Sequence, residues 1–157
     1  MDAASPSGDP SSTYALMVAS TGEDIDRRVI ERAIELAGQL PERPVIHVVS
    51  IARVWGTSLG LQNPGLFPTK KEWQAQVDLV AAAVKALKHR GFEAKGRVIG
   101  SRHAAKTIES VAVAEDCEAI VIGGTPQPRW RRLLRQDEAD NLFRRSVVPV
   151  YVIDVSM

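Results

Sequence analysis

The sequence predicts an α/β protein of three layers, with helices on both faces of a parallel sheet. The first observation is that short apolar runs, typical of buried strands, alternate with segments whose apolar residues recur at helical spacing. The second is the order of these segments, β-α-β-loop-α-β-α-β-α-β, which favours parallel strands joined by right-handed crossovers. The third is the length of 157 residues, which suits one domain with a substantial core.

The composition narrows the classes of function. A hydrophobic content of 45% and a charged content of 25% are typical of a globular domain. The formal net charge of +1 gives no overall electrostatic reason to expect a nucleic acid or an anionic membrane as partner. No apolar run approaches the roughly 18 residues of a spanning helix, and the N-terminus lacks a signal core, so we expect a cytoplasmic protein. The single cysteine, Cys117, excludes an internal disulfide and fits a reducing compartment.

The first segments predict a tail, a strand and a helix. Residues 1–12 are small, polar and proline-bearing, which predicts a disordered tail in front of one domain at residues 13–157. Residues 14–19 (YALMVA) form a nearly continuous apolar run that predicts a central strand. Ser20 stands three residues before Glu23, a capping-box pattern that predicts the start of the first helix.

A long loop interrupts the pattern after the second strand, which is predicted at residues 45–51 (VIHVVSI). In residues 52–68, glycine, proline and asparagine are interleaved with large apolar side chains. A loop of this length is a lid over a binding site or a partner surface, or it covers the protein's own sheet, and all these readings stay open. A helix is predicted from Thr69 to just before Gly91.

The last part of the chain repeats the strand and helix alternation. Residues 92–99 predict the most polar strand, which we place at an edge, and residues 102–114 predict a helix. Residues 119–124 (AIVIGG) read as a buried strand closed by two glycines, and residues 147–153 as the final strand. Since parallel sheets receive ligands at the carboxyl ends of their strands, residues 123–132 are the first place to expect chemistry.

Several blocks of residues resemble the universal stress protein family, a branch of the Rossmann-like nucleotide-binding folds. The resemblance covers residues 14–153. It implies a five-stranded parallel sheet of order 3-2-1-4-5, in which the loops after strands 1 and 4 face one crevice at the switch point. The blocks that carry it are His47-Val48-Val49, Arg97-Val98-Ile99-Gly100, Ile120-Val121-Ile122-Gly123 and Val147-Val148-Pro149-Val150.

The phosphate-binding motif that the resemblance implies is mostly missing. Family members that bind ATP carry a glycine, a second glycine three positions on, and a glycine followed by serine or threonine ten positions further. Gly123 matches the first position, whereas Pro126, Gln136 and Asp137 occupy the others. Proline has no amide to donate, and aspartate places a negative charge where phosphate would lie. Ser20 also stands where the family usually has an acidic residue.

Two hypotheses about ligands follow. The leading one is a dimeric binding or signalling module whose degenerate crevice binds ATP weakly or not at all, so that no cofactor is certain. The runner-up is binding of ATP or another adenine nucleotide, with an arginine-rich loop in place of the glycine motif. Alternatively, those arginines lie on a solvated helix start and pair with nearby carboxylates. The candidate binding residues are Ala19, Ser20, Val48, Gly123, Gly124, Arg129 and Arg132.

The remaining expectations concern partners and catalysis. By the resemblance, the final strand pairs across a two-fold axis to form a homodimer; the alternative is an ordinary core strand in a monomer. The three histidines show no metal-ligand spacing, and nothing assembles a nucleophile with a base, so we expect no metal site and no catalytic residues. Weak nucleotide hydrolysis is a third option, and Cys117 reads as a small core residue.

Overall fold

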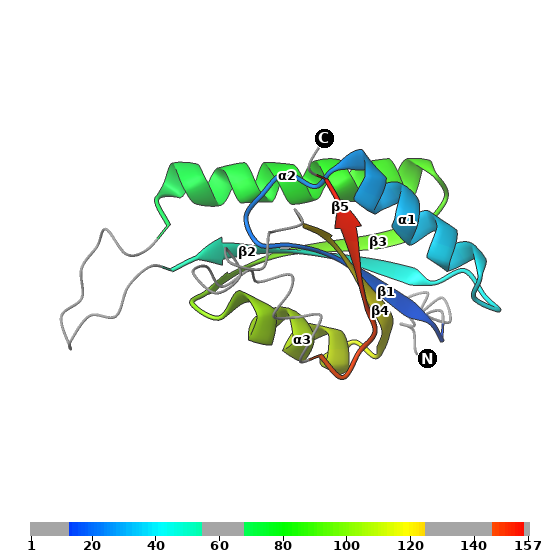
Figure 1. The fold of residues 1–157 in the computed structure, drawn as a ribbon. Coiled ribbons are helices and arrows are strands. Elements are labelled where there is room, and N and C mark those ends of the chain that lie inside the picture. Colours follow the sequence, from blue (N-terminus) through cyan, green and yellow to red (C-terminus); the bar gives the residue numbers. More distant parts are fainter. Residues whose placement is uncertain (1–12, 55–67, 125–145, 156–157) are drawn as a thin grey trace, which may run out of the picture.

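The computed structural model describes residues 13–54, 68–124 and 146–155. In these residues α1 and α2 cover one face of a five-stranded sheet and α3 covers the other (Figure 1). The strand order is β3-β2-β1-β4-β5 and each neighbouring pair is parallel, which confirms the predicted fold class and order. The elements are β1 (Ala15–Ser20), α1 (Arg27–Gly38), β2 (Val45–Arg53), α2 (Lys70–His89), β3 (Glu93–Ser101), α3 (Ala104–Ala114), β4 (Cys117–Gly124) and β5 (Val150–Asp154).

The burial of each strand follows its place in the sheet. All six residues of β1 are buried, since β1 lies at the centre with helices on both sides. Its side chains alternate: Met17 and Ala19 pack toward α3, whereas Leu16 and Val18 pack toward α1 and α2. In β3 only Ala94 is buried, and in β5 no residue is. The prediction that the third strand is an edge is therefore confirmed for the described part of the chain.

The start of α1 differs from the prediction. The helix begins at Arg27 with Asp26 as its N-cap, and Asp26 accepts a 2.8 Å hydrogen bond from the amide of Arg28. Ser20 instead belongs to β1, and its hydroxyl donates to the carbonyl of Glu23 and accepts from the amide of Gly22, not from the Glu23 amide that a capping box requires. Gly22 between them has φ +107°, which no α-helix contains. The capping-box prediction for Ser20 and Glu23 was therefore wrong.

A capping box does form at the start of α2. The hydroxyl of Thr69 accepts from the Glu72 amide at 3.1 Å, and the Glu72 carboxylate accepts from the Thr69 amide at 3.0 Å. In the second half of this helix, Val80 and Leu87 are buried in the core. In the first half, Trp73 is 39% exposed. Among the described residues, no helix has the length and apolar character needed to cross a membrane.

Candidate functional site

The loops after β1 and β4 meet at the carboxyl edge of the sheet. Ala19 pairs with Ile122, so these two central strands are neighbours. The chain leaves β1 toward α1 on one face, whereas α3, which precedes β4, lies on the other face. This is the topological switch point, where parallel sheets commonly receive ligands. Of the candidate binding residues, the structure brings Ala19, Ser20 and Gly123 together around this crevice.

The crevice is nearly filled by side chains. Its cavity has a volume of about 20 Å³, far below the roughly 300–1,000 Å³ of small-molecule sites. Ile25, Val29 and Val155 line it. A Cβ added to Gly123 would lie 3.3 Å from a methyl group of Val29 and 3.3 Å from one of Val155. In the described residues, aliphatic side chains therefore occupy the space beside Gly123.

The charged side chains that line the crevice from the described residues do not favour phosphate. Glu23 and Asp24 are the only charged residues among the described residues that line it, and both are exposed carboxylates. A phosphate placed there would be repelled by both groups, because like charges at short range raise the electrostatic energy. Among the described residues, no lysine or arginine lines this cavity to compensate.

The loop after β1 uses its own polar groups. Ser20 is only 6% exposed, and its hydroxyl donates to the Glu23 carbonyl and accepts a 3.2 Å hydrogen bond from the Gly22 amide. The carbonyl of Thr21 accepts from Nε of Arg53 at 3.3 Å, and the carbonyl of Gly22 accepts from Nε2 of Gln76 at 3.0 Å. A ligand that bound these groups would have to displace protein partners, which offsets the gain from the new hydrogen bonds.

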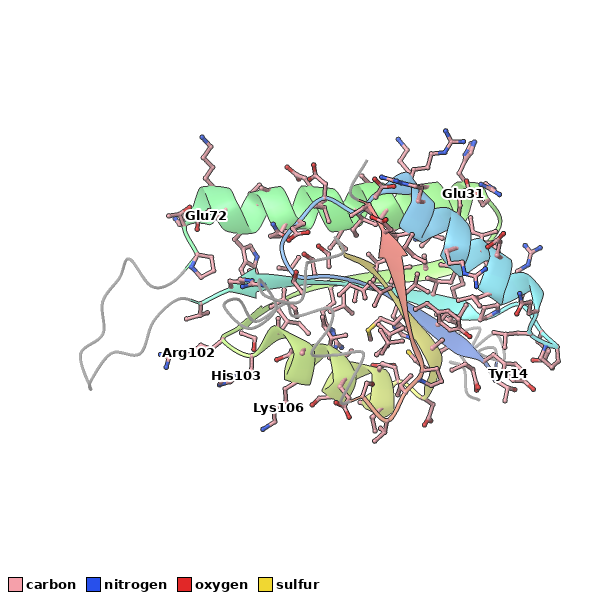
Figure 2. The ribbon with its side chains drawn as sticks, viewed as in Figure 1. Tyr14, Glu31, Glu72, Arg102, His103 and Lys106 are labelled. Atoms are coloured by element: carbon pink, nitrogen blue, oxygen red, sulfur yellow. The ribbon has the colours of Figure 1, made fainter. Side chains whose placement is uncertain are left out.

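A larger pocket lies one strand away, between β1, β2 and α2. Its volume is about 430 Å³, within the range of small-molecule sites. Thr21, Arg53 and Gln76 bring hydrogen-bonding groups to it, and Glu72 adds a carboxylate at the first turn of α2. Figure 2 shows Glu72 at the same edge of the molecule as Arg102 and His103, with Tyr14 at the opposite edge.

The other candidate residues have different surroundings. Val48 is 0% exposed and packs in the core beneath α1 and α2, so its side chain does not face the crevice. Gly124 is buried, and its carbonyl accepts from the amide of Val155 at 3.1 Å. Arg129 and Arg132 lie outside the described residues, as do Pro126, Gln136 and Asp137 of the altered motif. The roles of all seven candidate residues in binding a nucleotide stay predictions.

The sequence did not predict the residues that fill the crevice or those that hydrogen-bond to the loop after β1. Val29 lies in α1 and Ile25 just before it, and neither was predicted to line the crevice; Val155 follows the predicted final strand. Gln76 and Arg53 drew no attention, since a glutamine two turns into a helix and an arginine after a strand carry no spacing signal. Their contacts join segments that lie 54 and 32 residues apart, so only the folded structure reveals them.

Other chemically reactive groups lie away from the crevice. In the described residues, no group of three or more metal-ligating side chains occurs. His47 lies in β2, 3.8 Å from Glu115, and burial lowers the pKa of its imidazole. Cys117 is 8% exposed, and burial together with Glu115, Asp116 and Glu118 raises the pKa of its thiol to about 12, which makes it a poor nucleophile.

Comparison with protein families matches residues 15–154 to the universal stress protein family. A universal stress protein from Archaeoglobus fulgidus has a TM-score of 0.68 at 20% identity, over 94% of this chain and 99% of its own. The protein from that organism in complex with dAMP gives 0.62 at 18%, over 90% and 98%. A family protein from Arabidopsis thaliana with AMP bound gives 0.58 at 12%, over 90% and 91%. Comparison with curated protein sequences gave no match.

These likenesses at low identity show the fold, and the family match runs from the first residue of β1 to the last residue of β5. The strand order and the position of the crevice between β1 and β4 agree with it. The chain therefore belongs to the universal stress protein family.

Proposed function

We propose that this chain is a cytoplasmic binding or signalling module of the universal stress protein type, whose crevice binds ATP weakly or not at all. The observation that carries the proposal is the filled crevice of about 20 Å³ between β1 and β4. A triphosphate would need this space and a set of amide donors. Instead, Val29 and Val155 flank Gly123, and two carboxylates line the opening.

The test is a calorimetric titration of the protein with ATP and with AMP, after native mass spectrometry of protein purified without added nucleotide. We expect no co-purified nucleotide and no saturable heat up to millimolar ATP. A stoichiometric nucleotide in the purified protein, or micromolar binding, would contradict the proposal.

A second set of variants tests whether restoring the phosphate-binding motif and the space beside Gly123 restores ATP binding. Pro126→Gly, Gln136→Gly and Asp137→Ser together rebuild the phosphate motif, and Val155→Ala adds space beside Gly123. We expect measurable ATP binding only when the rebuilt motif and the added space are combined. Val113→Ala, on the exposed surface of α3, is the control for a valine truncation elsewhere. No gain in the combined variant would count against the assignment of the crevice.

The alternative function is binding of an adenine nucleotide through a different set of phosphate contacts. The two relatives described above carry dAMP and AMP, which each have one phosphate and need fewer phosphate contacts than ATP. In this reading Arg129 and Arg132 bind the phosphate in place of the glycine amides. Arg129→Ala combined with Arg132→Ala should weaken AMP binding at least tenfold, about 1.4 kcal/mol. An unchanged affinity would remove the arginine clamp, and Arg27→Ala, whose side chain is 91% exposed on α1, is the matched control.

We also propose a homodimer formed through β5. Within the described sheet β5 is an edge strand, and its Val152 is 41% exposed. Nearby Val147 is 78% exposed, whereas Val148 is buried and Val150 is half-buried. An apolar sheet edge of this kind favours pairing with a second strand. Val152→Lys should shift sedimentation velocity from dimer to monomer, and Val113→Lys on α3 should not; a wild-type monomer at tens of micromolar would refute the proposal.

No catalytic role is assigned to any residue in this proposal. If the module nevertheless hydrolysed nucleotide, phosphate release would exceed a no-protein control and would disappear when Gly123 is substituted. We expect phosphate release equal to the no-protein control both in the wild type and in a Gly123 variant.

A further inference from the structure

One glutamine connects three segments of the chain beside the crevice. Gln76 lies on α2, and its side-chain oxygen accepts a short hydrogen bond from the hydroxyl of Ser50 on β2. Its side-chain nitrogen donates to the carbonyl of Gly22, in the loop after β1, at 3.0 Å. Both ends of one amide group are therefore used, and they join residues that lie 26 and 54 positions away in the sequence.

Only one orientation of the Gln76 amide satisfies both neighbours. The Gly22 carbonyl can only accept, so it requires the NH₂ end of the amide. The hydroxyl of Ser50 can donate, and it meets the oxygen end. Ser50 is 0% exposed, so water does not compete for its hydroxyl. The Gly22 carbonyl therefore fixes the orientation of the amide, and the buried hydroxyl of Ser50 anchors its oxygen end.

The loop that Gln76 contacts contains Gly22 in a backbone conformation that favours glycine. Gly22 has φ +107°, and a Cβ there would lie 3.3 Å from the carbonyl oxygen of Ile51. Loops that follow strands are drawn from the less stable parts of a fold unless hydrogen bonds restrain them. Here the restraint on the Gly22 carbonyl comes from α2, and that on the Thr21 carbonyl comes from Arg53 of β2.

We propose that Gln76 is the positioning residue of the crevice, which acts through Gly22 to hold the loop after β1 against β2 and α2. Residues of this loop form one wall of the crevice, since Ser20, Thr21 and Glu23 all line it. A movement of the first turns of α2 would therefore reach the crevice through a single side chain. The inference rests on the proposed function only in treating the crevice as a degenerate nucleotide site. The hydrogen bonds that restrain the loop are present without any ligand.

The test is amide hydrogen exchange in the ligand-free protein, with Gln76→Glu as the main variant. The introduced carboxylate can still accept from Ser50 but cannot donate to the Gly22 carbonyl. Exchange of the backbone amide of Gly22, which donates to the hydroxyl of Ser20, should accelerate roughly threefold to tenfold, as expected for the loss of one net hydrogen bond that limits local opening. Gln74→Glu is the matched control, because it adds the same charge to the same helix. The side-chain amide of Gln74 donates to Asp78 on the exposed face of α2.

Two further measurements separate positioning from general destabilisation. Exchange of the amides of β4 should be unchanged in Gln76→Glu, whereas a loss of global stability would accelerate both regions. Acidification that protonates the introduced carboxyl group should restore the protection, because the group can then donate to Gly22. If Gln76→Glu folds poorly, Ser50→Ala replaces it, since that variant frees the amide from its anchor.

Equal loop exchange in Gln76→Glu and Gln74→Glu would overturn the proposal, as would acceleration that spreads equally to β4. These outcomes are independent of nucleotide binding. An ATP titration of the same proteins addresses the proposed function by itself: saturable binding by the wild type would refute that function and leave the exchange result standing.

Discussion

Gly123→Ala tests directly whether the crevice is a packed region or an open site. The new methyl group would meet Val29 and Val155, each at 3.3 Å, which is closer than well-packed carbon atoms normally approach. Overpacking of this kind costs about 1–3 kcal/mol, and the loss of glycine's freedom in the unfolded chain returns about 0.4–1 kcal/mol. The net expectation is a loss of roughly 0.5–2 kcal/mol, or about 1–8 °C in Tm for a chain of this size.

The assay is thermal unfolding followed by circular dichroism. Gly38→Ala is the control, because Gly38 lies at the end of α1 with nothing within 4 Å of an added Cβ, and it should keep or raise Tm. In the Val155→Ala background, Gly123→Ala should cost less than in the wild type, since the contacting methyl groups of Val155 are gone and only that of Val29 remains. If Gly123→Ala raises Tm as Gly38→Ala does, the crevice has room and the packing argument fails.

Three further predictions concern stability and reactivity. Gly96→Ala should lower Tm more than Gly123→Ala, because the added Cβ would overlap a methyl group of buried Val80, and Val80→Ala should relieve most of the loss in a double-mutant cycle. Hydrogen bonds from Arg28 lower the pKa of Asp26 to about 2 from its ordinary 3.8, so this carboxylate stabilises the fold above pH 3.8 and the contribution is lost as the pH falls toward 2. Asp26→Asn, which can still cap α1, should flatten the acid limb of a urea-unfolding series in that window; an unchanged limb would contradict the assignment. Cys117 should react with a thiol reagent at pH 8 only after denaturation, since burial raises its pKa to about 12, and rapid labelling of the native protein would refute this.

The fold was predictable from the sequence because its signals are local and repeated. Residues 15–19 are apolar throughout, and they form a central strand, β1, in which every residue is buried. The polar character of β3 placed it at an edge, where only Ala94 is buried. Each of these patterns can be read within ten residues. A parallel sheet then follows from the alternation of strands and helices.

Capping patterns were less informative, because the same spacing occurs twice with two outcomes. Ser20 and Glu23 have the same spacing as Thr69 and Glu72, yet only the second pair forms a capping box. The first pair encloses Gly22, whose positive φ belongs to a turn, and Ser20 is still engaged in the ladder with Ser50. A glycine inside the pattern is therefore a physical reason to expect a turn in place of a helix start.

The state of the crevice could not be predicted, because it depends on residues brought together from separate elements. Val29 comes from α1, Gly123 from β4 and Val155 from the residue after β5. A missing glycine motif in the sequence indicates a weak phosphate grip, but it does not say whether the space is empty or filled. That distinction needs the packing of three segments, which only the folded chain displays.

The same geometry explains why a single reversion should not restore ATP binding. Val29 and Val155 both contact the site of Gly123, so the energetic effects of their substitution are coupled and cannot be added. The loop after β1 is held separately, through Gln76 and Arg53, and its carbonyl groups already have partners. To bind a nucleotide, the crevice would need more space beside Gly123 and free hydrogen-bond donors in its loops. The repulsion from the carboxylates at its opening would also have to be offset. Because these three requirements lie on different elements, the weak ATP binding that we propose would have causes distributed over the site, and the combined variant is the one that tests it.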